Sequence, residues 1–484
     1  MRRSTFALAA TLVIAAAAAA ATPVARAAGT LCVGSKPGCY STIQAAVNAA
    51  HNGDTINISP GTYAGGITID VSVNVIGAGS NRTTIEGGGP VLTIGVEQAS
   101  AEPTVSIKGV TITGGFNDSY PDTVVSQGGG VSIPQAAGLS TGATVTIADS
   151  VITRNTVAPQ KALPPGGFCP GPLSCAFASG GGIDNHGTLT VTNTQISDNL
   201  SGGAGSVTLG ANGGGIENQG PATLNLTNSS VTGNRAVVAA PNGAFTNGGG
   251  IQNNGVATIE RSIVSGNSID AGNVAGEGEV DAFGGGIDDE GSLILRDSAV
   301  EDNQVRAGLS SGGFVLALGG GLFVGGTSTI HHSRLAGNNI DAVAPTGAAL
   351  AGGGGVNLVP GAEATASDSL VARNSITAAA ASGATVDGGA VANLGFMTLE
   401  RTLVTDNRGT ATGPGGVAQG GGIWNVNPFG GPAPQLTLID SGVTANRLSA
   451  SEGNAQGGGL FTESPVTLAR TVIAGNKPDQ CYGC

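Results

Sequence analysis

Carboxylates recur at one position of a repeated phrase, the residue that follows a glycine cluster and an aliphatic residue. In chain order this position holds Ser132, Asp184, Glu217, Gln252, Asp288, Phe323, Asn357, Ala392, Trp424 and Phe461. Its first half is acidic, and its second half carries the chain's only tryptophan. Paired carboxylates can act as acid and base on a glycosidic bond, and aromatic faces can stack on sugar rings.

A second phrase recurs with the same period as the first and indicates the fold. It reads polar residue or Arg, Ser/Thr, any residue, aliphatic, two residues and Asn, and it recurs ten times, at spacings of 30 to 44 residues. The asparagines that end it are Asn155, Asn199, Asn234, Asn267, Asn303, Asn338, Asn374, Asn407, Asn446 and Asn476. Each repeat holds about three short alternating strands and then a Gly/Ala-rich insert, with no helical period.

Strands this short cannot bury an apolar face alone, so the repeats must stack. One coil per repeat brings each Asn to the same corner, where Asn side chains can bond along the stack and tolerate a left-handed backbone. The pattern therefore predicts an all-β, right-handed parallel β-helix of about twelve coils. A β-propeller is disfavoured, because ten repeats exceed its usual four to eight blades.

The expected organisation has four parts. Residues 1–28 read as a signal peptide, with Arg2 and Arg3 before an apolar run and Ala25-Arg26-Ala27 as the cleavage site. Residues 29–65 form an N-terminal cap with a short helix that a capping box at Ser41 begins. Residues 66–476 form the β-helix, and residues 477–484 form a Cys-containing tail.

The net charge indicates which classes of partner the protein can bind, and the cysteine content indicates where the protein is located. The net charge of −13 falls to about −16 when cleavage removes three arginines, which disfavours nucleic acid. The six cysteines lie in three close pairs, Cys32/Cys39, Cys169/Cys175 and Cys481/Cys484, which indicates disulfides in an exported chain. We expect a secreted monomer with no integral membrane segment after cleavage.

The stretch Tyr40 to Tyr63, followed by Val75-Ile76-Gly77, resembles the N-terminal cap of pectin-lyase-fold proteins. The Gly-Gly-Gly-aliphatic and Asn repeats resemble those of polymorphic outer membrane proteins and of many secreted bacterial β-helix proteins. The resemblance covers roughly residues 30–484 and implies the fold. The fold itself hosts lyases, hydrolases, epimerases and adhesins, so the resemblance leaves the activity open.

The candidate site lies on the outward face of one sheet. Asp184 and Glu217, on adjacent coils, are expected about 5 Å apart, near the separation in retaining glycosidases. With Asp288 they are the candidate catalytic residues, for a polysaccharide lyase or a glycoside hydrolase. The candidate substrate-binding residues are Asn185, His186, Asp289, Phe323, Trp424 and Phe461.

Three alternatives stay open. The carboxylates could bind Ca²⁺ through their oxygens. The row could instead consist of solvent-exposed polar residues that have no role beyond hydration of the surface. Trp424 could instead contact the insert at Asn427-Pro428-Phe429. The main hypothesis is an exported protein that binds, and cleaves if active, an extracellular polysaccharide. The rival is a non-catalytic cell-surface adhesin or structural spacer.

Overall fold

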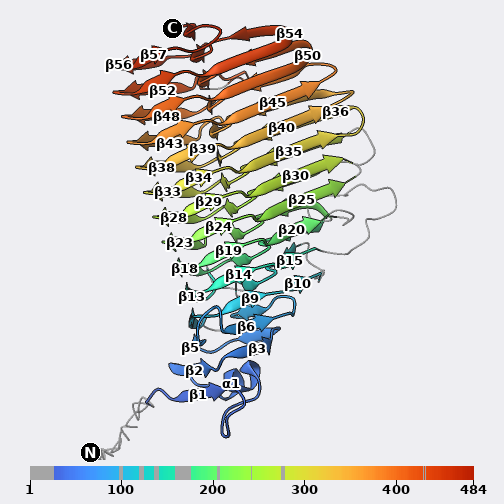
Figure 1. Ribbon diagram of the computed structural model, residues 1–484, viewed down its shortest axis with the longest axis vertical. Helices are drawn as coiled ribbons and strands as arrows, with labels where there is room; N and C mark the ends of the chain where they lie inside the picture. Colours follow the sequence, from blue (N-terminus) through green and yellow to red (C-terminus); the bar gives the residue numbers. More distant parts are fainter. Residues whose placement is uncertain are drawn as a thin grey trace, which may run out of the picture.

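The computed structural model describes residues 27–96, 102–118, 125–135, 141–158, 176–203, 208–240, 243–273, 278–428, 430 and 432–484. These residues form an all-β, right-handed parallel β-helix with one short helix (Figure 1). The first coils run through sheets A, B and C, and from β10 to β54 each coil adds an excursion into sheet D between sheets B and C. The described residues supply 14, 13, 18 and 13 strands to sheets A, B, D and C, so the coil number differs slightly from the expected twelve.

Sheet A consists of β1 (Thr30–Val33), β2 (Asp54–Ile58), β5 (Val73–Ile76), β8 (Thr104–Lys108), β13 (Thr144–Ala148), β18 (Thr188–Thr192), β23 (Thr223–Thr227), β28 (Val256–Glu260), β33 (Ser292–Arg296), β38 (Thr327–His331), β43 (Glu363–Ser367), β48 (Phe396–Glu400), β52 (Gln435–Ile439) and β56 (Val466–Ala469). Sheet B consists of β3 (Gly61–Ala64), β6 (Thr83–Glu86), β9 (Thr111–Thr113), β14 (Val151–Thr153), β19 (Gln195–Ser197), β24 (Ser230–Thr232), β29 (Ile263–Ser265), β34 (Ala299–Glu301), β39 (Arg334–Ala336), β44 (Leu370–Ala372), β49 (Leu403–Thr405), β53 (Gly442–Thr444) and β57 (Val472–Ala474). Sheet C consists of β4 (Ile67–Ile69), β7 (Leu92–Ile94), β12 (Val131–Ile133), β17 (Ile183–Asn185), β22 (Ile216–Asn218), β27 (Ile251–Asn253), β32 (Ile287–Asp289), β37 (Leu322–Val324), β42 (Val356–Leu358), β47 (Val391–Asn393), β51 (Ile423–Asn425), β55 (Leu460–Thr462) and β58 (Cys481–Tyr482).

The inserts form sheet D, a sheet that the repeat pattern left unassigned. The outgoing strands of sheet D are β10 (Phe116–Asn117), β15 (Thr156–Val157), β20 (Leu200–Gly203), β25 (Arg235–Ala240), β30 (Ser268–Asn273), β35 (Gln304–Leu309), β40 (Asn339–Ala344) and β45 (Ser375–Ala380). The returning strands are β11 (Val125–Gln127), β16 (Ala176–Ser179), β21 (Thr208–Asn212), β26 (Ala244–Asn247), β31 (Gly278–Phe283), β36 (Gly313–Leu318), β41 (Ala348–Gly352) and β46 (Ala384–Asp387). The long strands β50 (Arg408–Gln419) and β54 (Arg447–Gln456) run out and back.

Sheet D projects from the solenoid on the right of Figure 1, opposite sheet A on the left. A cluster of buried Ala, Val, Ile and Leu residues lies between its outgoing and returning strands, apart from the solenoid core that sheets A, B and C enclose. Outgoing strands pair with outgoing strands of the next coil, and returning strands pair with returning strands. The inserts therefore have a core of their own, which is why such Gly/Ala-rich sequence is ordered.

A ladder of asparagines runs along the solenoid at the corner after sheet B, as the repeat predicts. Each side-chain Nδ2 donates to Oδ1 of the next Asn at 2.8–3.1 Å, from Asn155 through to Asn476. The left-handed backbone, however, belongs to the residue before each Asn, such as Arg154 or Gly233, with φ of +55° to +71°. The Asn is therefore needed for the hydrogen bonds of its buried side-chain amide, whereas the residue before it adopts the left-handed backbone of the turn.

The N-terminal helix α1 (Ile43–Ala49) covers the first coils and buries Ile43, Ala46 and Val47 in the solenoid core, as the sequence predicts. Its N-cap is Thr42, one residue after the predicted Ser41, because the Thr42 hydroxyl accepts from Ala45 N at 3.2 Å. None of the helices in the described ranges is both long and apolar enough to cross a membrane.

Disulfides join Cys32 to Cys39 and Cys481 to Cys484, as predicted. The predicted Cys169/Cys175 pair lies outside the described residues, as does nearly all of the predicted signal peptide. Strand β1 already pairs with β2 in sheet A, and β58 continues sheet C, so the solenoid sheets extend into the predicted cap and tail.

The Asn ladder generates a stability prediction. Replacing Asn303 by Ala should lower the free energy of unfolding by about 3 kcal/mol, because each buried polar group left unpaired costs about 1–3 kcal/mol. The backbone N–H of Asn267 loses its acceptor, Asn303 Oδ1, and is left unpaired. Asn267 Nδ2 and Asn338 Oδ1 each lose one of their two partners. Asn339→Ala is the matched control, since this half-buried side chain is outside the ladder. Guanidinium denaturation checks both variants, and equal losses would contradict the account.

Candidate functional site

The row predicted from the sequence is a single column of side chains on sheet C. The strands pair Ser132 with Asp184, Asp184 with Glu217, and so on in register to Phe461. The aliphatic residues before them, such as Ile183 and Ile216, lie in the solenoid core, so the row points away from that core as predicted. The row is nevertheless buried, with exposures of 0–5%. The interpretation of the row as solvated surface positions is therefore wrong.

The returning strands of sheet D cover the row. Their last residues form a facing column, each five residues before a member of the row: Gln127, Ser179, Asn212, Asn247, Phe283, Leu318, Gly352, Asp387, Gln419 and Gln456. The first glycine of each cluster turns the chain between the columns, with φ of +54° to +70°, where other residues are strained. We call the seam along which these two columns of side chains face each other the C–D groove.

Asp184 and His186 form a pair in the polar half of the groove. His186 Nε2 lies 3.0 Å from Asp184 Oδ2 and 3.1 Å from Gln127 Nε2. Burial lowers the pKa of His186, but the hydrogen bond to Asp184 and the charge of that carboxylate outweigh burial, so the pKa is raised above its usual value. The Asp184 carboxyl group thus favours the charged form of the imidazole.

Glu217 lies on the strand next to Asp184 and is 1% exposed. Burial, followed by the negative charge of Asp184, holds the pKa of Glu217 well above its usual range. Hydrogen bonds from Ser179, Asn212 and Gln219 oppose this shift without cancelling it, and the Gln219 amide donates at 2.6 Å. The environment therefore favours the protonated form of Glu217, the form that a general acid needs.

Asp288 completes the acidic part of the row and is fully buried. Burial raises the pKa of Asp288 well above its usual range, and the charges of Glu290, Asp289 and Glu217 add to the effect. Neither of its carboxyl oxygens has a hydrogen-bond partner in the described part of the chain. The same holds for Asp184 Oδ1, Glu217 Oε2 and Gln252 Oε1. The polar half of the groove therefore contains a line of buried carboxyl and amide oxygens that have no partner in the described part of the chain.

Asn185 and Asp289, predicted to bind substrate, lie elsewhere. They belong to an inner ladder at the corner between sheets C and A, where Nδ2 of Asn185 donates to Asn218, Asn218 to Asn253, and Asn253 to Asp289, each at 2.7 Å. Burial raises the pKa of Asp289 to about 6, and the hydrogen bond from Ser328 opposes that shift. Both residues are fully buried inside the corner, so the structure does not bring them into the groove.

The predicted aromatic residues line the other half of the row. Phe323 stacks on Phe283 of the facing column with ring centroids 4.9 Å apart, and Phe461 stacks on Tyr482 at 4.8 Å. Trp424 donates from Nε1 to Gln419 Oε1 at 3.1 Å and is 5% exposed. Pro428 of the insert lines the same pocket as Trp424, and Phe429 lies outside the described residues, so the insert contact stays a prediction. The sequence signal for the groove was the constant offset of five residues between the two columns, which the row alone did not reveal.

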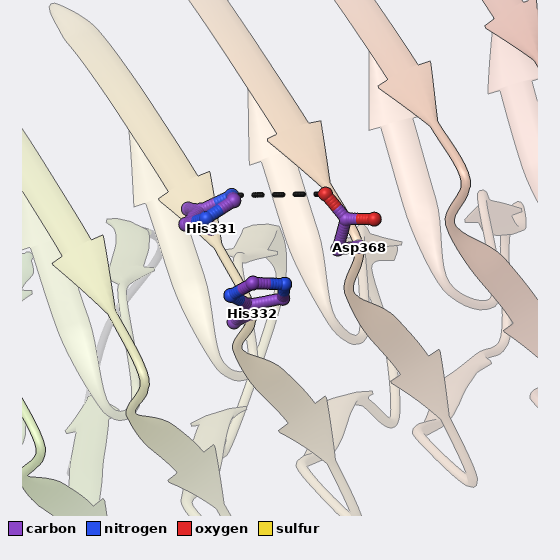
Figure 2. A group of neighbouring side chains, drawn as sticks. All are labelled: His331, His332 and Asp368. Carbon is purple, nitrogen blue, oxygen red and sulfur yellow. Dashed lines mark ion pairs between the residues drawn. The ribbon is translucent and has the colours of Figure 1, made fainter.

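One group of side chains in the described residues places three potential metal-ligand atoms within 4.8 Å of one another: His331, His332 and Asp368 (Figure 2). It lies at the corner between sheets A and B, with His331 Nδ1 3.8 Å from Asp368 Oδ2. Both carboxylate oxygens of Asp368 already accept from the Arg401 guanidinium, at 2.6 and 2.8 Å. Asp368 is therefore already paired with Arg401, and His332 of the cluster is exposed at the surface.

The raised pKa of Asp288 generates a second prediction. The folded protein keeps a proton on Asp288 at pH values where the unfolded chain has lost it, so stability falls as pH rises through that interval. Asp288→Asn should therefore raise Tm at about pH 8 and leave Tm nearly unchanged at about pH 4. The exposed Glu363→Gln is the control. A difference in Tm that did not grow with pH would contradict the burial of an unpaired carboxyl.

The chain matches no protein-family model and no curated protein. Among solved structures it is similar to the A-module of the mannuronan C-5 epimerase AlgE6 from Azotobacter vinelandii, with 14% sequence identity and a TM-score of 0.34. The alignment covers 90% of this chain and 95% of that module. Similarity at this level identifies neither a shared family nor a shared activity.

Proposed function

We propose that the protein is exported and binds an extracellular polysaccharide along the C–D groove. The observation that carries the proposal is the line of buried, unpaired acceptor atoms on Asp184, Glu217, Gln252 and Asp288. Leaving a buried acceptor unpaired costs about 1–3 kcal/mol, so the free protein maintains this row at a cost. A ligand rich in hydroxyl donors removes that cost on binding.

The charge of the groove selects among glycans. Asp184, Glu217, Asp288 and Glu290 all lie along its polar half, and the described residues place one imidazole, His186, against them. Burial favours the neutral forms of Glu217 and Asp288, so a uronate carboxylate would be desolvated there with His186 as the one cationic partner in the described groove. The groove therefore favours a neutral polysaccharide.

Side chains two residues after the row cover it and form the rim of the groove. Gln219 donates to Glu217, His186 pairs with Asp184, and Asn254 lies 3.5 Å from the Gln252 amide. These rim side chains are only half-buried, and Glu290 is exposed. An incoming sugar meets the rim first, so its hydroxyls form hydrogen bonds with the rim side chains and reach the oxygens of the row between them.

Cleavage of the bound polysaccharide is the second candidate function. It is favoured by one observation: the environment keeps Glu217 protonated on the strand next to the Asp184–His186 pair. Glu217 would donate its proton to the glycosidic oxygen, and Asp184 would act as the nucleophile or base. A non-catalytic adhesin has the same groove but no turnover.

Affinity electrophoresis through gels that contain single polysaccharides tests binding. The wild-type protein should be retarded by a neutral polysaccharide, and Gln219→Ala should weaken retention about three- to tenfold, the effect of one lost hydrogen bond. Glu363→Ala on sheet A is the control, and an arm with chelator tests the Ca²⁺ alternative. Equal retention of Gln219→Ala and wild type, or retention by no polysaccharide, would overturn the proposal and favour the spacer.

Turnover of the retained polysaccharide separates the two functions. If the protein is a hydrolase, new reducing ends appear, and Glu217→Gln lowers kcat about 10²- to 10⁴-fold, the usual contribution of a general acid. Unsaturated ends would instead indicate a lyase. Retention without either product would contradict the catalytic function and leave the binding function intact.

A further inference from the structure

The apolar half of the groove contains an enclosed pocket of about 280 Å³. The stacked Phe283 and Phe323 rings bound one end, and Trp424 and Pro428 bound the other. Leu350 and Leu394 are among the side walls. This volume is at the small end of ligand pockets and is too small for a polymer segment.

Two small residues create the pocket. In the facing column, Gly352 has no side chain where Phe283 and Leu318 have large ones. In the row, Ala392 is a small residue between Phe323 and Trp424. A Cβ on Gly352 would lie 2.9 Å from Leu318 Cδ2 and 3.2 Å from Asn357 Oδ1, so it would intrude on the pocket wall. The space is therefore set by small residues in two independent columns.

Two buried polar side chains that line this otherwise apolar pocket carry atoms with no partner among the described residues. Asn357 is 1% exposed, and neither its Nδ2 nor its Oδ1 has a hydrogen-bond partner among the described residues. Asp387 is 7% exposed, with Oδ1 unpaired, and burial raises its pKa to about 7. An amide that is unpaired at both ends matches a ligand that offers one donor and one acceptor.

We propose that this pocket binds a small, neutral aromatic compound that carries one primary or secondary amide. The ring stacks between the Phe323 and Trp424 ends, as Phe283 already stacks on Phe323. The ligand carbonyl accepts from Asn357 Nδ2, and the ligand N–H donates to Asn357 Oδ1 or to Asp387. A carboxylate in the same place would meet the acceptors of Asn357 and Asp387 and be rejected.

This site is separate from the proposed polysaccharide contacts, because neither Gln219 nor Glu290 lines the pocket. Polysaccharide retention and pocket binding can therefore fail independently. Each has its own substitutions and its own ligand.

Trp424 reports directly on the pocket, since it is the chain's only tryptophan. Titration of the full-length protein with phenylacetamide should change Trp424 emission saturably, with one site by calorimetry. Phenylacetate and acetamide should each bind at least about tenfold more weakly, because one lacks the donor and the other lacks the ring. No saturable change with phenylacetamide, or equal binding of phenylacetate, would overturn the proposal.

Three variants test which groups make the site. Ala392→Leu should fill the pocket and abolish the response, while Tm stays level or rises because a cavity is removed. Asn357→Leu should weaken phenylacetamide about three- to tenfold and leave toluene binding unchanged or stronger. Phe116→Ala, at an exposed ring on β10, is the control. Unchanged phenylacetamide affinity in folded Ala392→Leu would overturn the proposal.

Discussion

In-register stacking of the coils is the constraint on which the rest of this structure depends. In sheets A, B and C the parallel strands pair residue for residue, so each position of the repeat becomes a column of side chains about 4.8 Å apart. A buried column must satisfy its own polar groups along the stack. The Asn ladder does so by donating from each coil to the next, and it fixes the register that every other column inherits.

The groove is a consequence of this register. Because each insert leaves at the same corner and returns through the same glycine turn, the inserts stack into sheet D instead of forming separate loops. The returning strands then lie against the row on sheet C, and two columns that the chain keeps five residues apart face each other. The groove changes from acidic to apolar along its length because both columns change together, from Ser179 and Asp184 to Leu318 and Phe323.

The repeat predicted the β-helix, the helical cap, the Asn ladder and the register of the Asp184–Phe461 row. It did not predict sheet D, because the inserts are rich in Gly and Ala and vary in length, so their alternation is weak. Their apolar cluster depends on the next coil's insert and is not visible within one repeat. For the same reason the burial of Asp184 and Glu217 was missed: alternation shows which side of a strand a residue faces, but not whether a second sheet covers that side. Asn185 and Asp289 were assigned to a site on sequence adjacency, although alternation turns them into the inner corner.

The central claim, that sheet D covers the row on sheet C, is tested most directly by the fluorescence of Trp424, the single tryptophan, in the unliganded protein. The structure predicts a blue-shifted emission that iodide quenches weakly, because Trp424 is 5% exposed beneath Gln419 and Pro428. A red-shifted emission that iodide quenches as readily as a free indole would show that the row faces solvent. That result would contradict the groove and everything inferred from it.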